Sequence, residues 1–193
     1  MVQNQTQPIF CNENPLSILY AEAAGTPIAA VTFWRSFLSP VGSGHVLAVW
    51  RAQESGTGSV DLFTDHQELG KLIFTTFLHH WPPFHQERLS DVALQEAHFT
   101  VEADLPRLYR VACTAAGIDL LAEWRAVRSV SRHEAHTHAD VRYNDVLLAV
   151  ENTVGFCDQA RILVNGQPLA GQMCYGVDSW ESSAYVTLCE TWS

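Results

Sequence analysis

Histidine and carboxylate side chains are concentrated in one short stretch of the sequence, Arg132 to Asp140. If this stretch is extended, Glu134, His136 and His138 project from one face, with neighbours about 7 Å apart. Two imidazoles and a carboxylate at this spacing can converge on Zn²⁺ or Fe²⁺ when a distant residue completes the shell. Because the stretch is polar on both faces, three interpretations stay open: a metal site, a metal-free acid–base site and a solvated loop.

A second candidate for chemistry is His80, at the end of an amphipathic segment. At 100° per residue it follows Thr76 by about one helical turn on the inward face, where the two side chains can meet. Burial there would favour the neutral imidazole near pH 7, as a general base requires. A core histidine hydrogen-bonded to a backbone carbonyl fits the same position. Nearby, Trp81 and Phe84 indicate either the rim of an apolar cavity or ordinary core packing.

Tyr143 and Asp145 form a third candidate, at the start of a strand expected over Tyr143–Glu151. They share one face of that strand, whose continuous apolar run suggests burial on both sides. Acidic groups at the end of a buried strand usually accept hydrogen bonds at the mouth of a sheet. In a dry pocket they can instead serve as an acid or a base.

The elements that must position these residues are mostly strands, because apolar and polar residues alternate at period two between turn residues. The short connections predict about nine strands in an antiparallel sheet, and Asn165–Gly166 is a strong hairpin signal. The expected strands cover residues 28–38, 46–51, 60–63, 92–101, 108–115, 118–127, 143–151, 161–164 with 167–175, and 184–192.

One helix is expected over residues 65–81, with Asp65 as N-cap, Glu68 at the capping-box position and Pro82 ending it. Its apolar arc is wide enough to be covered on more than one side. We therefore predict a single domain over residues 1–193. It would be a mainly β fold: an antiparallel β-barrel or strongly curved sheet with one well-buried helix. A hot-dog-like sheet wrapped around the helix is the alternative, and a two-sheet sandwich is a third possibility.

Composition narrows the function classes. The 193 residues are 47% hydrophobic and 10% aromatic and carry a net charge of −10, with no basic run, which argues against disorder, nucleic-acid binding and attraction to anionic membranes. The sequence shows no signal peptide and no long apolar span, and its five cysteines have no metal-binding spacing, so a cytoplasmic location is expected. The motifs of serine hydrolases, P-loop proteins and zinc proteases are missing.

These observations favour a protein that binds a small hydrophobic or aromatic metabolite inside a barrel. Proton-transfer chemistry of the isomerase, dehydratase (lyase) or cyclase type would need no cofactor and no motif, only titratable groups in a dry pocket. His80 would be the base, with Tyr143 or Asp145 as its partner. The expected ligand contacts are Thr76, Trp81, Phe84 and Trp124. The alternatives are a Zn- or Fe-dependent enzyme that uses Glu134, His136 and His138, and a non-catalytic carrier or homodimer subunit.

Overall fold

The computed structural model describes residues 8–22, 25–53, 58–81, 84, 89–135, 141–176 and 181–192. The helical elements are α1 (Gln67–Thr76) and the 3₁₀ turns η1 (Leu78–His80) and η2 (Leu89–Asp91). The strands are β1 (Phe10–Tyr20), β2 (Pro27–Leu38), β3 (Gly44–Arg51), β4 (Ser59–Thr64), β5 (Leu94–Asp104), β6 (Leu108–Ala115), β7 (Ile118–Ala135), β8 (Arg142–Tyr143), β9 (Val146–Leu147), β10 (Ala149–Val164), β11 (Gln167–Pro168) and β12 (Ala184–Trp192).

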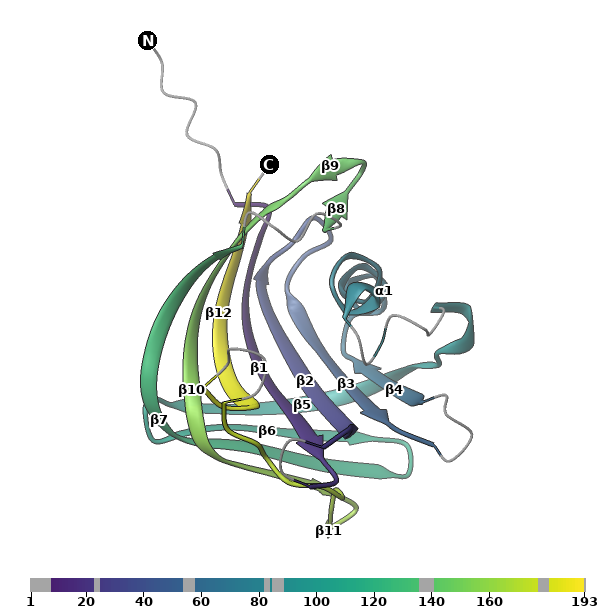
Figure 1. The fold of residues 1–193 in the computed structure, drawn as a ribbon. Coiled ribbons are helices and arrows are strands. Elements are labelled where there is room, and N and C mark those ends of the chain that lie inside the picture. Colours follow the sequence, from purple (N-terminus) through teal and green to yellow (C-terminus); the bar gives the residue numbers. More distant parts are fainter. Residues whose placement is uncertain are drawn as a thin grey trace.

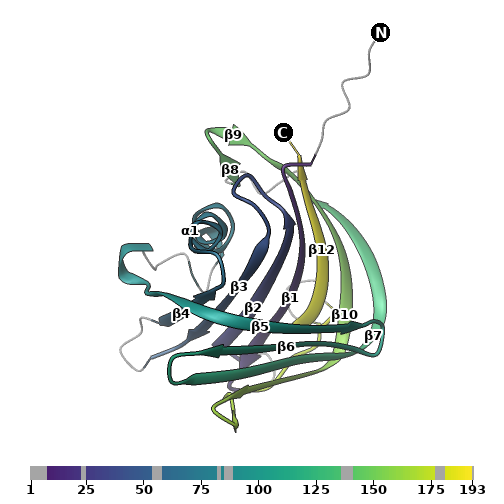
Figure 2. The same cartoon turned by 180° about the vertical axis from the view of Figure 1, so that it is seen from behind.

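Ten of these strands form one strongly curved sheet that closes into a ring, while β8 and β9 pair in a separate two-stranded sheet. The order of the ten-stranded sheet is β11-β10-β12-β1-β2-β3-β4-β5-β6-β7, and β7 pairs back onto β10. The pairings around the ring are antiparallel except that of β4 with β5, between which the chain passes through α1. Figures 1 and 2 show β5 and β6 running steeply across the direction of β1, β2 and β12. The predicted class, a mainly β fold with a curved sheet and one helix, is confirmed.

Large side chains fill the interior of the ring. One core cluster draws residues from β1 to β7, β10 and β12, and its largest members include Phe33, Phe63, Tyr109 and Trp124. The indole Nε1–H of Trp124 donates to the carbonyl of Leu16 at 2.8 Å, so the polar atom of this buried side chain has a hydrogen-bond partner. Because α1 contributes nothing to this cluster, the sheet does not wrap around the helix as the hot-dog alternative required.

The helix α1 packs on the face of the sheet opposite the ring interior, which we call the outer face. Figure 1 shows it beside β2 and β3. Leu69, Ile73 and Phe74 pack there against side chains of β2 to β4, including Trp34 and Leu62. Within the part of the chain that the structure describes, no helix combines the length and apolar character needed to cross a membrane.

The helix is shorter than predicted at both ends. His66, not Asp65, is the N-cap, and its side chain accepts the backbone N–H of Leu69 at 3.1 Å. Asp65 instead accepts the backbone N–H of His45 at 2.7 Å, which removes it from capping. At the other end, the last two residues of α1 are the β-branched Thr75 and Thr76, which favour a helix less than unbranched residues do. The hydroxyl of Thr75 also donates to the carbonyls of Lys71 and Leu72.

Several strand predictions were wrong in extent: the strand expected over 118–127 continues to Ala135, and the strand expected over 161–164 begins at Ala149. The strand expected over residues 143–151 is broken because Asn144 and Asp145 adopt positive φ angles of 47° and 65° and turn the chain between β8 and β9. The strand expected over 167–175 is reduced to Gln167–Pro168, although the Asn165–Gly166 turn before it forms as predicted. A further strand, β1, was not predicted.

Glu123 on β7 is a buried carboxylate held by two arginines. It accepts from Arg110 at 2.8 Å and from Arg125 at 3.1 Å. Burial opposes ionisation of Glu123, but the two guanidinium groups outweigh it and lower the pKa of this carboxyl.

Glu123→Gln is therefore expected to lower stability at neutral pH and to have little effect in acid. A lowered folded-state pKa contributes stability above the unfolded pKa of about 4.3, and that contribution disappears as pH falls through the folded value. Urea unfolding of both proteins at pH 7 and near pH 2.5 measures the difference. An equal deficit at both pH values would show that the carboxylate charge is not what matters.

Candidate functional site

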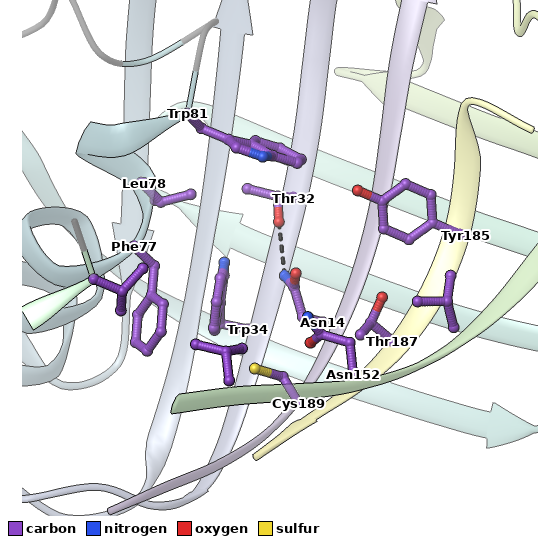
Figure 3. Close-up of a pocket in the computed structure, with 13 residues that line it drawn as sticks. Asn14, Thr32, Trp34, Phe77, Leu78, Trp81, Asn152, Tyr185, Thr187 and Cys189 are labelled. Carbon is purple, nitrogen blue, oxygen red and sulfur yellow. Dashed lines mark hydrogen bonds between the residues drawn. The ribbon is translucent and has the colours of Figure 1, made fainter. Parts of the chain in front are cut away.

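A cavity of about 340 Å³ lies on the outer face of the sheet, between four strands and the segment that follows α1. Figure 3 shows the side chains of the strands on one side of it and Phe77, Leu78 and Trp81 on the other. The floor consists of residues from β1 (Asn14), β2 (Thr32 and Trp34), β10 (Val150, Asn152 and Val154) and β12 (Tyr185, Thr187 and Cys189). Val141, just before β8, also lines it.

The polar residues of the floor lie next to one another because of the register of its strands. Asn14 on β1 lies opposite Thr187 on β12, and Cys189 on β12 lies opposite Asn152 on β10. Asn12 stands opposite Cys189 on the other side, so it continues the same polar patch beyond the cavity lining. Directly opposed side chains have Cβ atoms about 5 Å apart, and these groups therefore form one connected surface.

Several buried polar atoms of this patch have no hydrogen-bond partner within the described residues. Asn14 is satisfied, since its amide donates to the Thr32 hydroxyl at 2.8 Å and to the carbonyl of Phe33 at 2.7 Å. In contrast, Trp34 Nε1 and Thr187 Oγ1, which belong to residues of the cavity wall, have no hydrogen-bond partner. The two side-chain amide atoms of the buried Asn12 also have none. An unpaired buried donor or acceptor costs about 1–3 kcal/mol, so these atoms require an explanation.

The opposite wall is aromatic and aliphatic. The ring of Trp34 lies 4.8 Å from that of Phe77, and Trp81 stacks nearly parallel on Phe84 at 6.1 Å. Backbone hydrogen bonds hold this wall in place, because the N–H of Trp81 donates to Leu78 and that of Phe84 donates to Trp81. The chain leaves α1 at Phe77 and immediately makes a 3₁₀ turn, which brings Leu78 and Trp81 over the sheet.

The ionisable groups of the described lining are neutral at pH 7. Burial raises the pKa of the Cys189 thiol to about 12, with nearby Cys11 and Glu190 adding to the effect. Burial likewise raises the pKa of Tyr185 above its ordinary range, with a smaller contribution from Tyr20. Among the described residues that line the cavity, none carries a formal charge. The site therefore offers hydrogen bonds and apolar contact and no strong acid–base pair.

Of the predicted ligand contacts, Trp81 lines the cavity. Phe84 is buried directly behind it, and Thr76 is buried on α1 without reaching the lining. Trp124 lies in the ring interior, on the other face of the sheet. Large side chains fill the space where the sequence led us to expect a pocket, and the cavity lies outside the ring instead.

The predicted catalytic residues are not brought together. Tyr143 on β8 is half-buried with its ring 6.0 Å from that of Phe10, next to the cavity but not in its lining. Asp145 is exposed in the β8–β9 turn because that turn replaces the expected strand. His80 ends η1 between the two wall residues Leu78 and Trp81, and its side chain lies outside the described residues.

The predicted metal ligands fall largely outside the structure's description. The backbone of Glu134 is at the end of β7, opposite Glu151 on β10, but its side chain is not described, and His136 and His138 belong to the undescribed residues 136–140. Elsewhere in the described ranges, no group of three His, Cys, Asp or Glu side chains could hold a metal ion. The metal site stays a prediction.

A second hollow, of about 450 Å³, opens on the other face of the sheet at one end of the ring. Its lining is mainly apolar, including Leu105, Val127 and Leu188, with Glu13 as a carboxylate at its side. Glu13 accepts the Tyr109 hydroxyl at 2.6 Å and an Arg35 guanidinium at 3.4 Å. Both hydrogen bonds end on the same carboxylate oxygen, Oε2.

Sequence reasoning missed the polar floor of the cavity. Asn14 belongs to a strand that was not predicted, Thr187 was assigned to a strand without being singled out, and Asn152 lies one residue beyond the strand expected over 143–151. One signal was available: Thr187, Cys189 and Thr191 repeat at period two in a strand whose other face is apolar except for Glu190. Comparison of the chain with protein-family models, with curated proteins and with solved structures found no match.

Proposed function

We propose that this protein binds a small uncharged organic molecule in the cavity between α1–η1 and the outer face of the sheet. The observation that carries the proposal is the pair of unpartnered buried atoms in the cavity wall, Trp34 Nε1 and Thr187 Oγ1. Their residues are only 6% and 5% exposed, so a ligand that pairs with them would recover the cost of burying them.

The size and walls of the cavity support the same proposal. A volume of about 340 Å³ is near the lower end of the ~300–1,000 Å³ range of ligand pockets. Phe77, Leu78 and Trp81 supply apolar contact area on one side, and the strand residues supply a few placed polar groups on the other. This combination is typical of sites that bind one small molecule.

Binding is better supported than proton transfer. The titratable groups of the described lining, Tyr185 and Cys189, both have raised pKa values and stay protonated at pH 7. The position of His80 in the chain, between Leu78 and Trp81, keeps catalysis by this residue as a second candidate function. Once a bound compound is identified, this second function can be tested with His80→Gln. If His80 is the catalytic base, the variant still binds the compound but no longer converts it to product.

Val154→Phe is expected to abolish ligand binding, because a larger side chain on the cavity floor occupies the ligand's volume. Val154 is 1% exposed and lines the cavity, whereas Val146 on β9 is 46% exposed and lines neither hollow, so Val146→Phe is the matched control. Each protein is incubated with a small-molecule metabolite extract, desalted, and weighed by mass spectrometry under native and denaturing conditions.

We expect the wild type and Val146→Phe to retain a compound of a few hundred daltons that is released on unfolding, and Val154→Phe to retain none. Circular dichroism first establishes that both variants are folded. Equal retention by the three folded proteins would place binding elsewhere, and no retention by the wild type would contradict the proposed function.

A further inference from the structure

We infer that the ligand is an uncharged, planar ring compound with one polar edge that carries both an acceptor and a donor, as in a carboxamide or a lactam. This inference rests on the proposed function and adds the chemical class of the ligand. Three features of the cavity lead to it: the one-sided distribution of its polar atoms, the kind of hydrogen bond those atoms lack, and the absence of charge in the described lining.

Apart from the indole N–H of Trp81, the polar side-chain atoms of the lining lie on one side of the cavity. Asn14, Thr32, Asn152 and Thr187 project from the strands, while the α1–η1 side consists of the aromatic and aliphatic wall (Figure 3). A monosaccharide carries hydroxyl groups all around its ring and would leave those that face the wall unpaired and buried. A flat ring with a single polar edge can instead place its apolar face and far edge against Trp81 and Phe77.

The unpartnered atoms specify what that polar edge must contain. An indole N–H only donates, so Trp34 requires an acceptor such as a carbonyl oxygen. The hydroxyl of Thr187 accepts as well as donates and can take an N–H from the same edge. Beyond Cys189, both amide atoms of Asn12 also lack partners, so the unsatisfied patch continues behind the lining with the same mixed character.

Charge in the ligand is disfavoured by the same lining. A carboxylate or an ammonium would lose its hydration and meet no opposite charge among the described lining residues. Tyr185 and Cys189 do not supply one, because burial keeps both protonated near neutral pH. A purely apolar ring would avoid this cost but would leave the N–H of Trp34 unpaired.

The test uses three probes that share a benzene ring: benzamide, benzoate and toluene. Protein labelled with ¹⁵N in its tryptophans gives one indole N–H signal for each of the six, and Trp34→Phe identifies the signal of Trp34. Benzamide is expected to move the Trp34 signal downfield in a saturable way, since its carbonyl accepts that proton. The Trp124 signal is the internal control, because its N–H is already bonded to Leu16 inside the ring.

We expect benzoate to bind at least about ten-fold more weakly than benzamide and toluene to cause no downfield shift, with every effect lost in Val154→Phe. If benzoate or toluene binds as tightly as benzamide and Val154→Phe abolishes it, the ligand class is wrong while the binding site stands. If no probe moves Trp34 but the retained-compound experiment succeeds, the ligand class is again wrong. Failure of both experiments overturns the proposed function itself.

Discussion

Replacing Trp124 with alanine is expected to lower the free energy of unfolding by about 3–5 kcal/mol, the range found when a large aromatic side chain is removed from a core. Trp124 is fully buried and packs edge-on against Tyr109, in a cluster to which nearly every strand of the ring contributes. A cavity there has few neighbours able to collapse into it, because the strands are fixed by their pairing around the ring. Urea denaturation followed by circular dichroism measures the loss.

Trp124→Phe is the companion variant. It keeps most of the ring's volume but removes the donor to the Leu16 carbonyl, which lies 2.8 Å from Nε1, so a smaller loss of about 1–3 kcal/mol is expected. Because Trp124 faces the ring interior and not the cavity, the folded fraction of either variant should bind ligand as the wild type does. Selective loss of binding by folded Trp124→Phe would revive the interior pocket that the sequence suggested.

Thr187→Val is expected to stabilise the ligand-free protein by about 1 kcal/mol while weakening ligand binding. The hydroxyl of Thr187 is buried without a partner in the described structure, and valine has nearly the same shape without a group to desolvate. For a chain of this length the gain corresponds to a rise in Tm of roughly 2–4 °C. Differential scanning calorimetry of the ligand-free proteins gives the shift.

Thr32→Val provides the matched control with the opposite sign. Thr32 lines the same cavity and is equally buried, but its hydroxyl accepts the amide of Asn14 at 2.8 Å. The same substitution at Thr32 leaves the buried amide N–H of Asn14 without its acceptor and should destabilise the protein. If both variants change stability in the same direction, the hydroxyl of Thr187 is not an unsatisfied group, and its part in ligand recognition falls with it.

Some strands were located correctly because their two faces differ in polarity, whereas β2, which is buried on both faces, was located from its β-branched and aromatic residues. The hairpin of β6 and β7 was recognised because Val111 and Cys113 share one face of β6, and because Ala122 and Trp124 share a face of β7 opposite charged residues. That alternation is a local property and survives in any tertiary context. The helix was found for the same reason, but its N-cap was not. Asp65 bonds to the backbone N–H of His45, twenty residues away in the chain, and His66 caps the helix instead.

The candidate site was only partly predictable, because it depends on long-range pairing. Trp81 was singled out from its neighbours in the chain, and it does line the cavity. Asn14 was not, since the segment Cys11–Pro15 has the composition of a polar loop. Its polar side chains are compatible with a buried strand because that strand crosses beneath a cavity. Nothing local indicates that β1 lies between β2 and β12, and this placement alone brings Asn14 opposite Thr187.

The pairing of β1 with β12 also sets the order of events during synthesis. Phe10 is paired with Thr191, so the first described strand has no partner on one side until the last one has left the ribosome. Until then the edges of β1 and β10 that β12 covers stay open, and open edges invite pairing with other chains. The cavity floor takes Thr187 and Cys189 from that last strand. A nascent chain therefore cannot form the cavity floor that we propose for ligand binding before translation reaches β12.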